Sequence, residues 1–434
     1  MITDARIDLA LAAAAPRRSG VVSRVVGLNL EVDGLEAAIG DEVTVVTPSG
    51  LLTTEVVALR DGGLVCLPFG EMRGVRAGAR AEAVERAATI NVGAELLGRV
   101  LDGMGQPLDG GPSLAHLPAV TLDGEPPHPL LRGRVDQQLA LGVRAMDTLV
   151  SCGRGQRLGI FAGSGVGKSS LLSMIARGSD AEVSVIALIG ERGREVREFL
   201  ENDLGPEGLA RSVVVVATSD QPALVRLRAA FVATRIAEHF RDTGADVVLM
   251  MDSVTRFCMA QREVGLSAGE PPATRGYPPS VFALLPKLLE RAGAGERGSI
   301  TGLYTVLVEG DDMNEPIGDA ARSILDGHVV LSRKLASSGH FPAIDVLESI
   351  SRVTGAICTP EQRTAATELR RLLAAHREAR DLIEIGAYVP GTNPLVDRAV
   401  ALRDVIDMFL CQDMDDSTPL EQSWAVLQQL VAAA

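Results

Sequence analysis

The sequence predicts an α/β core that lies between a small N-terminal β-barrel and a C-terminal helical domain, and three features of its 434 residues support this. Long apolar runs alternate with helical patterns in the middle of the chain. Short β-branched runs precede them, and helical stretches follow them. Near-continuous apolar runs fit strands of a parallel sheet that is buried on both faces. Their alternation with helices indicates a doubly wound α/β fold.

Composition and charge exclude several classes of protein. Hydrophobic residues make up 46% of the chain and charged residues 23%, as in a folded globular protein. The net charge of −14 argues against a nucleic acid or an anionic membrane as the main partner, because either needs a cationic face. The five cysteines have no metal-binding spacing, which predicts reduced thiols in a cytoplasmic protein. We expect neither a membrane span nor a secretory signal.

The N-terminal part predicts a tail and then a small β domain. Residues 1–19 hold an alanine run and form either a frayed tail or a short helix that docks on a partner. In residues 20–90, β-branched runs are separated by turn residues, and Asp61-Gly62 predicts a hairpin. The runs are Val21–Val26, Glu42–Val46 and Thr53–Leu59. Several short strands without a long helix favour a closed barrel.

Residues 91–358 predict the α/β domain. It begins with a turn-rich connector, residues 91–150, in which neither Gly98–Gly110 nor Pro126–Pro129 predicts a regular element. Residues 224–240 have the apolar spacing of a helix. The buried parallel strands are predicted at Val183–Ile189, Val213–Val216, Val247–Met251 and Tyr304–Val308. In residues 359–434 we predict helices at Arg363–Ile383, Leu395–Phe409 and Leu420–Val431.

One segment combines a strand, a glycine-rich turn and a helix: Leu158-Gly-Ile-Phe-Ala-Gly-Ser-Gly-Val-Gly-Lys-Ser-Ser170. Its glycines let successive backbone N–H groups face one point, and the helix that follows adds its positive dipole end. Lys168 supplies a cation for the β- and γ-phosphates, and Ser169 a hydroxyl for Mg²⁺. The predicted phosphate-binding residues are Gly163, Ser164, Gly165, Val166, Gly167, Lys168, Ser169 and Ser170. The segment predicts a P-loop NTPase (RecA-like) core.

The residue that opens this loop is Ala162, where the strict pattern has glycine. This position is the entrance of the turn and not its phosphate-facing tip. We therefore expect alanine to be tolerated there, provided that its φ is negative.

Charged residues follow two of the predicted strands. Asp252 ends the run Val247–Met251, where a P-loop enzyme places the carboxylate associated with Mg²⁺. Glu191 follows Gly190 after the run that ends at Ile189, so it lies at the same edge of the sheet and can polarise a water molecule. Arg192 can bind the γ-phosphate, and Glu195 can reach Mg²⁺-bound water. The alternative is a solvated cluster of charges on a loop.

The chain resembles the rotary and secretion ATPase family, which is related to the catalytic β subunit of ATP synthase, and is most similar to its flagellar type III export branch. The resemblance spans almost the whole chain from about Gly20. Its motifs are Phe161-Ala-Gly-Ser-Gly-Val-Gly-Lys-Ser169, Gly190-Glu-Arg-Gly-Arg-Glu-Val196, Gly269-Glu-Pro-Pro-Ala-Thr-Arg-Gly-Tyr-Pro-Pro-Ser-Val-Phe282 and Pro342-Ala-Ile-Asp-Val-Leu-Glu-Ser-Ile-Ser351.

The resemblance implies a role for each matching residue. Glu191 matches the catalytic glutamate, Arg192 a γ-phosphate ligand, and Asp252 the aspartate associated with Mg²⁺. Arg256 matches an arginine near the phosphate. Arg352, whose local pattern alone indicates only a surface charge, matches the arginine finger that reaches the nucleotide of the neighbouring subunit. Phe341 falls where the family stacks an aromatic ring on adenine, and Tyr388 is expected at the other face.

A site that is completed across an interface implies a ring, usually a homo-hexamer, with the N-terminal barrels as a collar. The resemblance further implies ATP hydrolysis that releases chaperones and unfolds cargo at a membrane export gate. It also implies a stator-like regulator on the N-terminal tail and a stalk protein in the pore. Such a ring is cytoplasmic and peripheral at the inner face of the cell membrane.

Three other functions are compatible with parts of the pattern. The virulence-injectisome branch shares the core, but its phosphate loop more often resembles Ala-Ser-Ala-Gly-Cys-Gly-Lys-Thr. A ring subunit of an ion-translocating F/V-type ATPase binds nucleotide, but a non-catalytic subunit lacks the carboxylate that Glu191 provides. An RNA-translocating helicase needs a basic face with aromatic residues in the N-terminal domain, and residues 20–86 contain only Phe69 as an aromatic.

Overall fold

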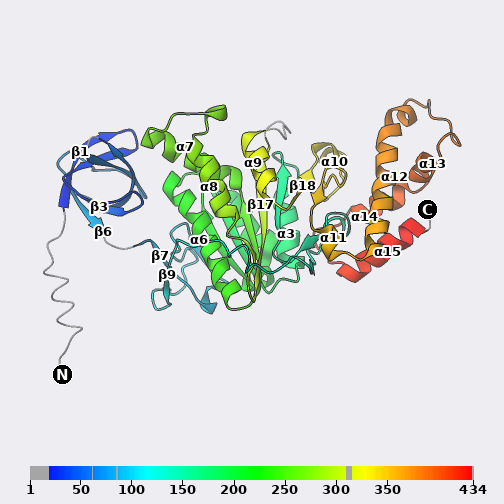
Figure 1. The fold of residues 1–434 in the computed structure, drawn as a ribbon, viewed down its shortest axis with the longest axis horizontal. Coiled ribbons are helices and arrows are strands. Elements are labelled where there is room, and N and C mark those ends of the chain that lie inside the picture. The colour runs from blue at the N-terminus through cyan, green and yellow to red at the C-terminus, as the bar shows by residue number, and fades with distance from the viewer. Residues whose placement is uncertain (1–18, 61, 85–86, 309–314, 433–434) are drawn as a thin grey trace, which may run out of the picture.

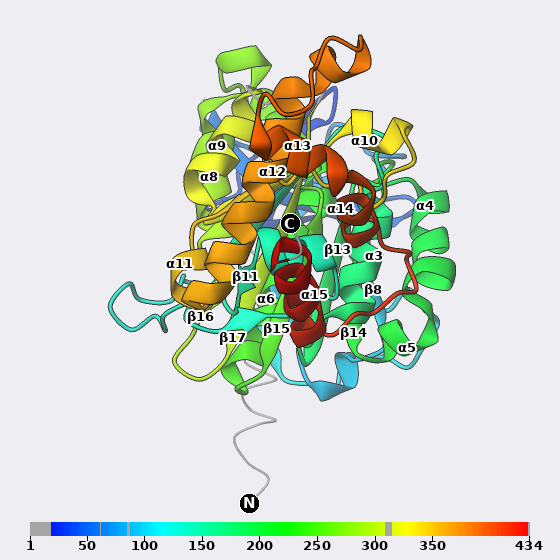
Figure 2. The same cartoon turned by 90° about the vertical axis from the view of Figure 1, so that its right-hand side faces the viewer.

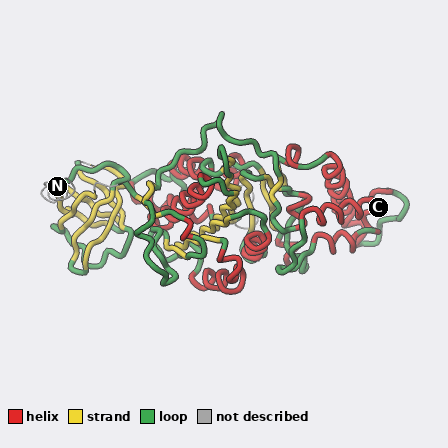
Figure 3. The backbone as a smooth tube through the Cα atoms, turned by 90° about the horizontal axis from the view of Figure 1, so that it is seen from below, coloured by secondary structure: helices red, strands yellow, loops and turns green. Residues whose placement is uncertain are grey.

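The computed structural model describes residues 19–60, 62–84, 87–308 and 315–432. Three units follow one another along its long axis, with the barrel at one end, the α/β domain in the middle and the C-terminal helices at the other end (Figures 1 and 3). Residues 1–18, which contain most of the predicted tail or docking helix, lie outside the described residues. No helix among the described residues is long and apolar enough to cross a membrane.

The N-terminal strands close into a barrel in the order β1-β2-β5-β4-β3-β6, as predicted. Alternate side chains fill its interior, including Val22, Val43 and Val45. Arg60 pairs with Gly63, so the predicted hairpin is confirmed. The bounds are β1 Ser19–Val26, β2 Asn29–Asp33, β3 Glu42–Thr47, β4 Gly50–Arg60, β5 Gly63–Pro68 and β6 Arg80–Val84.

The central sheet has nine strands in the described part of the chain, in the order β19-β18-β12-β17-β15-β13-β14-β8, with β16 paired to β17. Its pairs are parallel except β18–β19 and β16–β17. The bounds are β8 Val100–Asp102, β12 Arg157–Ala162, β13 Val183–Ile189, β14 Ser212–Ala217, β15 Asp246–Asp252, β16 Gly293–Ala294, β17 Ser299–Leu307, β18 Gly327–Leu331 and β19 Ile350–Ser351.

The prediction that Gly98–Gly110 holds no regular element was wrong, because its residues Val100–Asp102 form the edge strand β8. A strand of three residues is too short to show a periodic pattern. Its position is instead fixed by Arg99, which donates to Asp109 at 2.7 and 2.9 Å, and by the N–H of Val100, which donates to the same carboxylate.

Helices cover both faces of the sheet, so the doubly wound fold is confirmed. Ile186 of β13 packs with α2 and α3, whereas Ala187 packs with α6 and α7 on the other face. In Figure 1, α6 and α8 lie on the barrel side of the sheet and α3 on the other side. The bounds are α2 Arg144–Leu149, α3 Lys168–Gly178, α4 Gly193–Glu198, α5 Gly205–Ala210, α6 Ala223–Asp242, α7 Val254–Ala268, α8 Pro279–Leu289, α9 Pro316–Ile324 and α10 Arg333–Ser337.

The C-terminal helices are α11 Thr354–Ile357, α12 Pro360–Glu384, α13 Pro394–Ala401, α14 Arg403–Leu410 and α15 Leu420–Ala432. They lie in front of the sheet in Figure 2. The single helix predicted at Leu395–Phe409 is two helices, because the chain leaves helical geometry at Leu402. Arg144 joins this unit to the core by donating to Asp416 at 2.6 Å and to the carbonyl of Cys411 at 2.6 Å.

Candidate active site

The predicted phosphate loop lies between the carboxyl end of β12 and the first turn of α3. Gly165 has φ 75° and Gly167 has φ 89°, a left-handed conformation that favours glycine. Gly167 precedes α3 without a side-chain cap, so the N–H groups of the first turn have no side-chain acceptor. Ala162 ends β12 in extended backbone without a positive φ, so the condition under which alanine is expected to be tolerated there is met. The loop therefore has the geometry of an anion site.

The ammonium group of Lys168 lies between two carboxylates. It donates to Asp252 at 2.5 Å and to Glu191 at 3.3 Å. Asp252 ends β15 and Glu191 follows β13, and the carboxyl ends of these neighbouring strands meet at the edge that carries the phosphate loop. The structure thus brings together three residues that the sequence predicted from their positions after separate strands.

Burial and mutual charge set the protonation of this cluster. Burial lowers the pKa of Lys168, but Asp252 and Glu191 raise it, and the net change is upward. Burial raises the pKa of Glu191, Lys168 lowers it and Asp252 raises it again, and the net change is also upward. One ammonium therefore stabilises two carboxylates that lie close together. A phosphate in the loop would compete with these carboxylates for the ammonium group.

The carboxylate of Asp252 is held in place by a buried hydrogen bond. Its side chain is 5% exposed, and the hydroxyl of Thr305 donates to its Oδ1 at 2.8 Å. Sequence reasoning missed Thr305. Its signal was a hydroxyl inside the otherwise apolar run Tyr304–Val308, on a strand adjacent to the one that ends in Asp252.

Arg256 lies against the turn that carries Glu191. Gly190 has φ 71°, and a Cβ atom there would lie 2.9 Å from the Cβ of Arg256. The Nε of Arg256 is buried without a hydrogen-bond partner. A buried guanidinium donor without an acceptor is costly, and an anion in the loop is a suitable acceptor for it.

Arg192 lies outside the Lys168 cluster, whereas Glu195 lies beside it. The Arg192 side chain is 79% exposed and donates to Glu195 at 3.2 Å on the surface of α4. Glu195 also shares a hydrogen bond with Glu191, which contributes to the raised pKa of Glu191. Glu195 is therefore within reach of the cluster, whereas the structure does not bring Arg192 to it.

Phe341 and Tyr388 are placed differently. The Phe341 ring, which is 46% exposed, lies 3.5 Å from where a Cβ of Gly167 would be. Its backbone carbonyl accepts the N–H of Gln412 at 2.9 Å. The hydroxyl of Tyr388 donates to Asp397 at 2.9 Å, and its ring packs on α12 and α13. The ring contacts of the described residues do not join Tyr388 to Phe341.

Arg333, at the start of α10, is a second residue that sequence reasoning missed. It donates to the carbonyl of Ser164 in the phosphate loop at 3.2 Å. The guanidinium of Arg333 therefore lies beside the phosphate loop, and Phe341 follows it a few residues later in the chain. Nothing in its local sequence pattern distinguishes it from a surface arginine.

Arg352 lies at the opposite edge of the sheet. Its N–H donates to the carbonyl of Asp326 at 2.9 Å, and the N–H of Arg157, the first residue of β12, donates to the side chain of Asp326. The phosphate loop begins at the other end of β12, roughly 16 Å away at the usual rise of a strand. Arg352 is exposed, and its guanidinium donates to the carbonyl of Arg322 at 3.3 Å. The phosphate loop and Arg352 of one chain therefore lie at opposite ends of β12.

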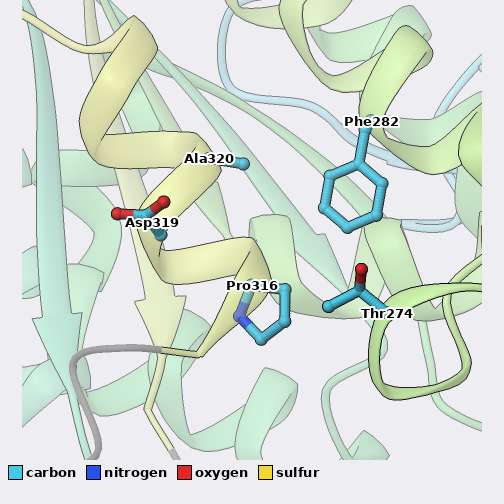
Figure 4. A pocket seen from close by; sticks show the side chains of 5 residues that line it. All are labelled: Thr274, Phe282, Pro316, Asp319 and Ala320. Atoms are coloured by element: carbon cyan, nitrogen blue, oxygen red, sulfur yellow. The ribbon is translucent and has the colours of Figure 1, made fainter.

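Two other features bear on ligands. Among the described residues, no group of three or more His, Cys, Asp or Glu side chains could hold a metal ion. The exposed hydroxyl-bearing Ser169 and the buried carboxylate of Asp252 fit the sparse protein ligation that Mg²⁺ has beside a nucleotide. A cavity of about 610 Å³ lies elsewhere, between α8 and α9, and none of the residues predicted to bind nucleotide lines it (Figure 4).

Known families match most of the chain. Residues 142–351 match the ATP synthase alpha/beta family, nucleotide-binding domain, and residues 358–429 match the T3SS EscN ATPase C-terminal domain. The flagellum-specific ATP synthase of Bacillus subtilis is 50% identical over 99% of this chain and 99% of its own length. The type 3 secretion system ATPase of Xanthomonas euvesicatoria is 49% identical over 95% of this chain and 93% of its own length.

The fold is also that of solved structures. The assembled ATPase EscN of the enteropathogenic E. coli type III secretion system has a TM-score of 0.91 and 48% identity, over 95% of this chain and 100% of that chain. With the loop geometry, this makes the protein a P-loop ATPase of the ATP synthase alpha/beta type. Within that class, the chain belongs to the family of flagellum-specific and type 3 secretion system ATPases. The resemblance drawn from the sequence motifs is thereby confirmed.

Proposed function

We propose that this ATPase is the catalytic subunit of a homo-hexameric ring that energises protein export through a flagellar type III apparatus. The Lys168–Asp252–Glu191 cluster at the phosphate loop carries the proposal, because it supplies the cation, the metal-associated carboxylate and the water-orienting carboxylate that hydrolysis needs. Similarity to flagellum-specific relatives in Bacillus subtilis and, at 48% identity, in Salmonella typhimurium supports the flagellar branch.

Each site residue has a proposed task. The backbone of Gly163–Gly167 and the first turn of α3, which includes Ser169 and Ser170, cradles the phosphates. Lys168 moves from the carboxylates to the β- and γ-phosphates, which leaves Glu191 free to orient the attacking water. Arg256 and, after a side-chain movement, Arg192 contact the phosphates. Phe341 stacks on adenine, and Tyr388 covers its other face only if the C-terminal helices move.

Mg²⁺ is the proposed cofactor, with Ser169 and Asp252 as its protein ligands and Glu195 acting through bound water. When bound, Mg²⁺ neutralises charge on the phosphates. Thr305 supports this task by fixing the carboxylate of Asp252.

Arg352 is proposed to act on the neighbouring subunit. It is exposed and lies at the edge of the sheet away from its own phosphate loop, so a second copy must present a nucleotide to it. A closed ring satisfies this requirement for every chain. The relative EscN has been solved as an assembled ATPase and in complex with its central stalk EscO. We propose the same arrangement here, with the barrels of residues 20–90 as a collar.

The remaining assignments rest on the family alone. We propose a cytoplasmic ring that lies at the inner face of the cell membrane, with a stator-like regulator on residues 1–19 and a stalk protein in the pore. Export-gate proteins and chaperone–cargo complexes are its other proposed partners. Residues 91–358 form the proposed ATPase domain and residues 359–434 the proposed C-terminal domain.

An injectisome ATPase is the second candidate. The SPI-2 type 3 secretion system ATPase of Salmonella typhimurium is 51% identical over 83% of this chain, so identity alone separates the two branches by little. Both candidates share the active site and the ring, and they differ in cargo.

The Glu191→Gln variant tests the catalytic assignment. It should abolish ATP hydrolysis and leave nucleotide affinity unchanged, because the carboxylate orients water and does not hold phosphate. Steady-state turnover and equilibrium binding of a fluorescent ATP analogue measure the two effects. Glu198→Gln, the same change on the exposed surface of α4, is the matched control. Undiminished turnover in Glu191→Gln would remove Glu191 from the mechanism.

A further inference from the structure

The segment Glu348–Arg352 is held to the sheet along its whole length. Ile350 and Ser351 form β19, which pairs with the first residues of β18. β18 in turn pairs with β12, the strand that ends in the phosphate loop. Two side chains reinforce this backbone pairing, one near each end of the segment Glu348–Arg352. Neither belongs to the ATPase machinery described above.

Gln156, directly before β12, is fully buried and contacts the arginine-bearing segment. Its side-chain amide donates to the hydroxyl of Ser351 at 3.0 Å and to the carbonyl of Asp326 at 3.2 Å. Its side-chain oxygen accepts the N–H of Gly153 at 2.9 Å. Ser351 is the residue before Arg352, and the carbonyl of Asp326 also accepts the N–H of Arg352. Gln156 thus fixes the backbone on both sides of the N–H of Arg352, through Ser351 and through the carbonyl of Asp326.

His328 in β18 holds the other end of the segment. Its Nε2 lies 3.1 Å from the carbonyl of Glu348, and because a carbonyl only accepts, this nitrogen carries the hydrogen. Its ring meets the ring of Phe161 edge-on, with centroids 5.7 Å apart. Phe161 is the penultimate residue of β12, just before the phosphate loop. One imidazole therefore contacts both the approach to the chain's own nucleotide and the segment that carries Arg352.

We propose that Gln156 and His328 are positioning residues for Arg352. They connect β12, the strand that leads into the phosphate loop of the same chain, to Arg352, which acts on the neighbouring chain. The inference rests on the proposed function, since it takes Arg352 to act on the neighbouring subunit. It predicts an effect with a direction. Loosening either contact impairs the site next door and leaves the chain's own site intact.

Mixed rings separate the two sites of one chain. A Glu191→Gln chain keeps its arginine and has an inactive site, whereas an Arg352→Ala chain keeps its site and lacks the arginine. Neither variant should hydrolyse ATP alone. Mixing them should restore activity at each interface where Arg352 of a Glu191→Gln chain reaches the intact site of an Arg352→Ala chain. A third substitution can then be placed on the arginine donor or on the arginine acceptor.

The third substitutions are Ser351→Ala, which removes the hydroxyl that Gln156 contacts, and His328→Leu. On the donor chain, each should lower the restored turnover by about 3- to 10-fold, the effect of one lost hydrogen bond. On the acceptor chain, each should change it less than about 2-fold. His328→Gln, which keeps a donor near the position of Nε2, should regain part of the loss. Ser323→Ala on the donor is the control, because its exposed hydroxyl donates to the carbonyl of Ala320 in its own helix.

The outcomes are distinct. Equal losses of turnover on the donor and acceptor chains would show that these contacts serve general stability. No loss of turnover on the donor chain would show that they do not position Arg352. Either result overturns the inference and leaves the shared active site unaffected. If mixing restores no activity, the shared site itself fails, and the inference fails with it. Thermal melting of each variant identifies a substitution that merely unfolds the chain.

Discussion

Glu191 combines two demands that oppose each other. In its proposed role it must be ionised to orient water, yet it is largely buried beside Asp252, and both burial and the neighbouring carboxylate favour its protonated form. Lys168 offsets part of this cost in the nucleotide-free protein. The ionised carboxylate of Glu191 therefore destabilises the folded protein. Such a loss of stability at an active site is a common compromise between activity and stability.

The stability of the Glu191→Gln variant should depend on pH with a definite sign. Since the folded-state pKa of Glu191 is raised above 4.5, its ionisation destabilises the folded state as pH rises through that pKa. Glutamine does not ionise. The free energy of unfolding of the variant relative to wild type should therefore increase as pH rises above 4.5, the ordinary pKa of a glutamate.

Denaturant unfolding of the nucleotide-free protein measures this difference, with Glu198→Gln as the control on an exposed carboxylate. A difference that decreases with pH would mean that the attraction of Lys168 for Glu191 outweighs burial.

At this scale, the sequence was informative about residues that follow strands. Lys168, Asp252 and Glu191 were predictable because parallel strands end at a common edge. Thr305, inside β17, and Gln156, directly before β12, were not, because a buried neutral polar side chain gives no sign of what it contacts. The position of Tyr388 depends on how α12 and α13 pack, and no local pattern contains that information.

At the scale of elements, α3 is fixed at both ends by glycines. Its last residue, Gly178, lies against Gly142, which has φ 73°. The N–H of Gly142 donates to Asp147 at 3.1 Å, and its carbonyl accepts from Gln412 at 2.8 Å. The helix that begins at the phosphate loop therefore ends where the C-terminal unit docks.

Gly142→Ala should be strongly destabilising. Its Cβ would lie 2.7 Å from the Cα of Gly178, so backbone must move in addition to the cost of a left-handed alanine. Gly98→Ala is the matched control, because Gly98 has φ 81° and open space around it. We expect Gly142→Ala to lower the free energy of unfolding by about 1 to 3 kcal/mol more than Gly98→Ala. Equal losses in denaturant unfolding would show that α3 tolerates displacement at this end.

Long, strongly patterned elements were predictable and short ones were not. The run Val183–Ile189 is β13 to the residue, because a strand buried on both faces must be apolar throughout. In contrast, β8 depends on the ion pair of Arg99 with Asp109, and the break at Leu402 occurs inside a continuous apolar pattern. The local sequence pattern shows neither the partner of Arg99 nor the position of this break.

At the scale of the whole molecule, the barrel is attached firmly to the ATPase core. Arg228 of α6 donates to Glu42 at 2.5 Å and to Glu55 at 2.9 Å, and its guanidinium lies 4.0 Å from the centre of the Phe69 ring. Asn29 donates to the carbonyl of Ser267 at the end of α7. In the proposed ring, these contacts would hold each barrel in a fixed orientation relative to its own ATPase domain.

The proposed mechanism requires two chains for one active site. It is tested most directly by measuring Mg²⁺-ATP turnover per chain as protein concentration is raised, with the mass of the assembly followed in the same samples. Turnover per chain should rise in step with assembly, and the Arg352→Ala variant should assemble without that rise; loss of an arginine finger generally slows turnover by roughly 10³- to 10⁵-fold. Turnover that is independent of assembly would contradict the account, because each chain would then carry a complete site of its own.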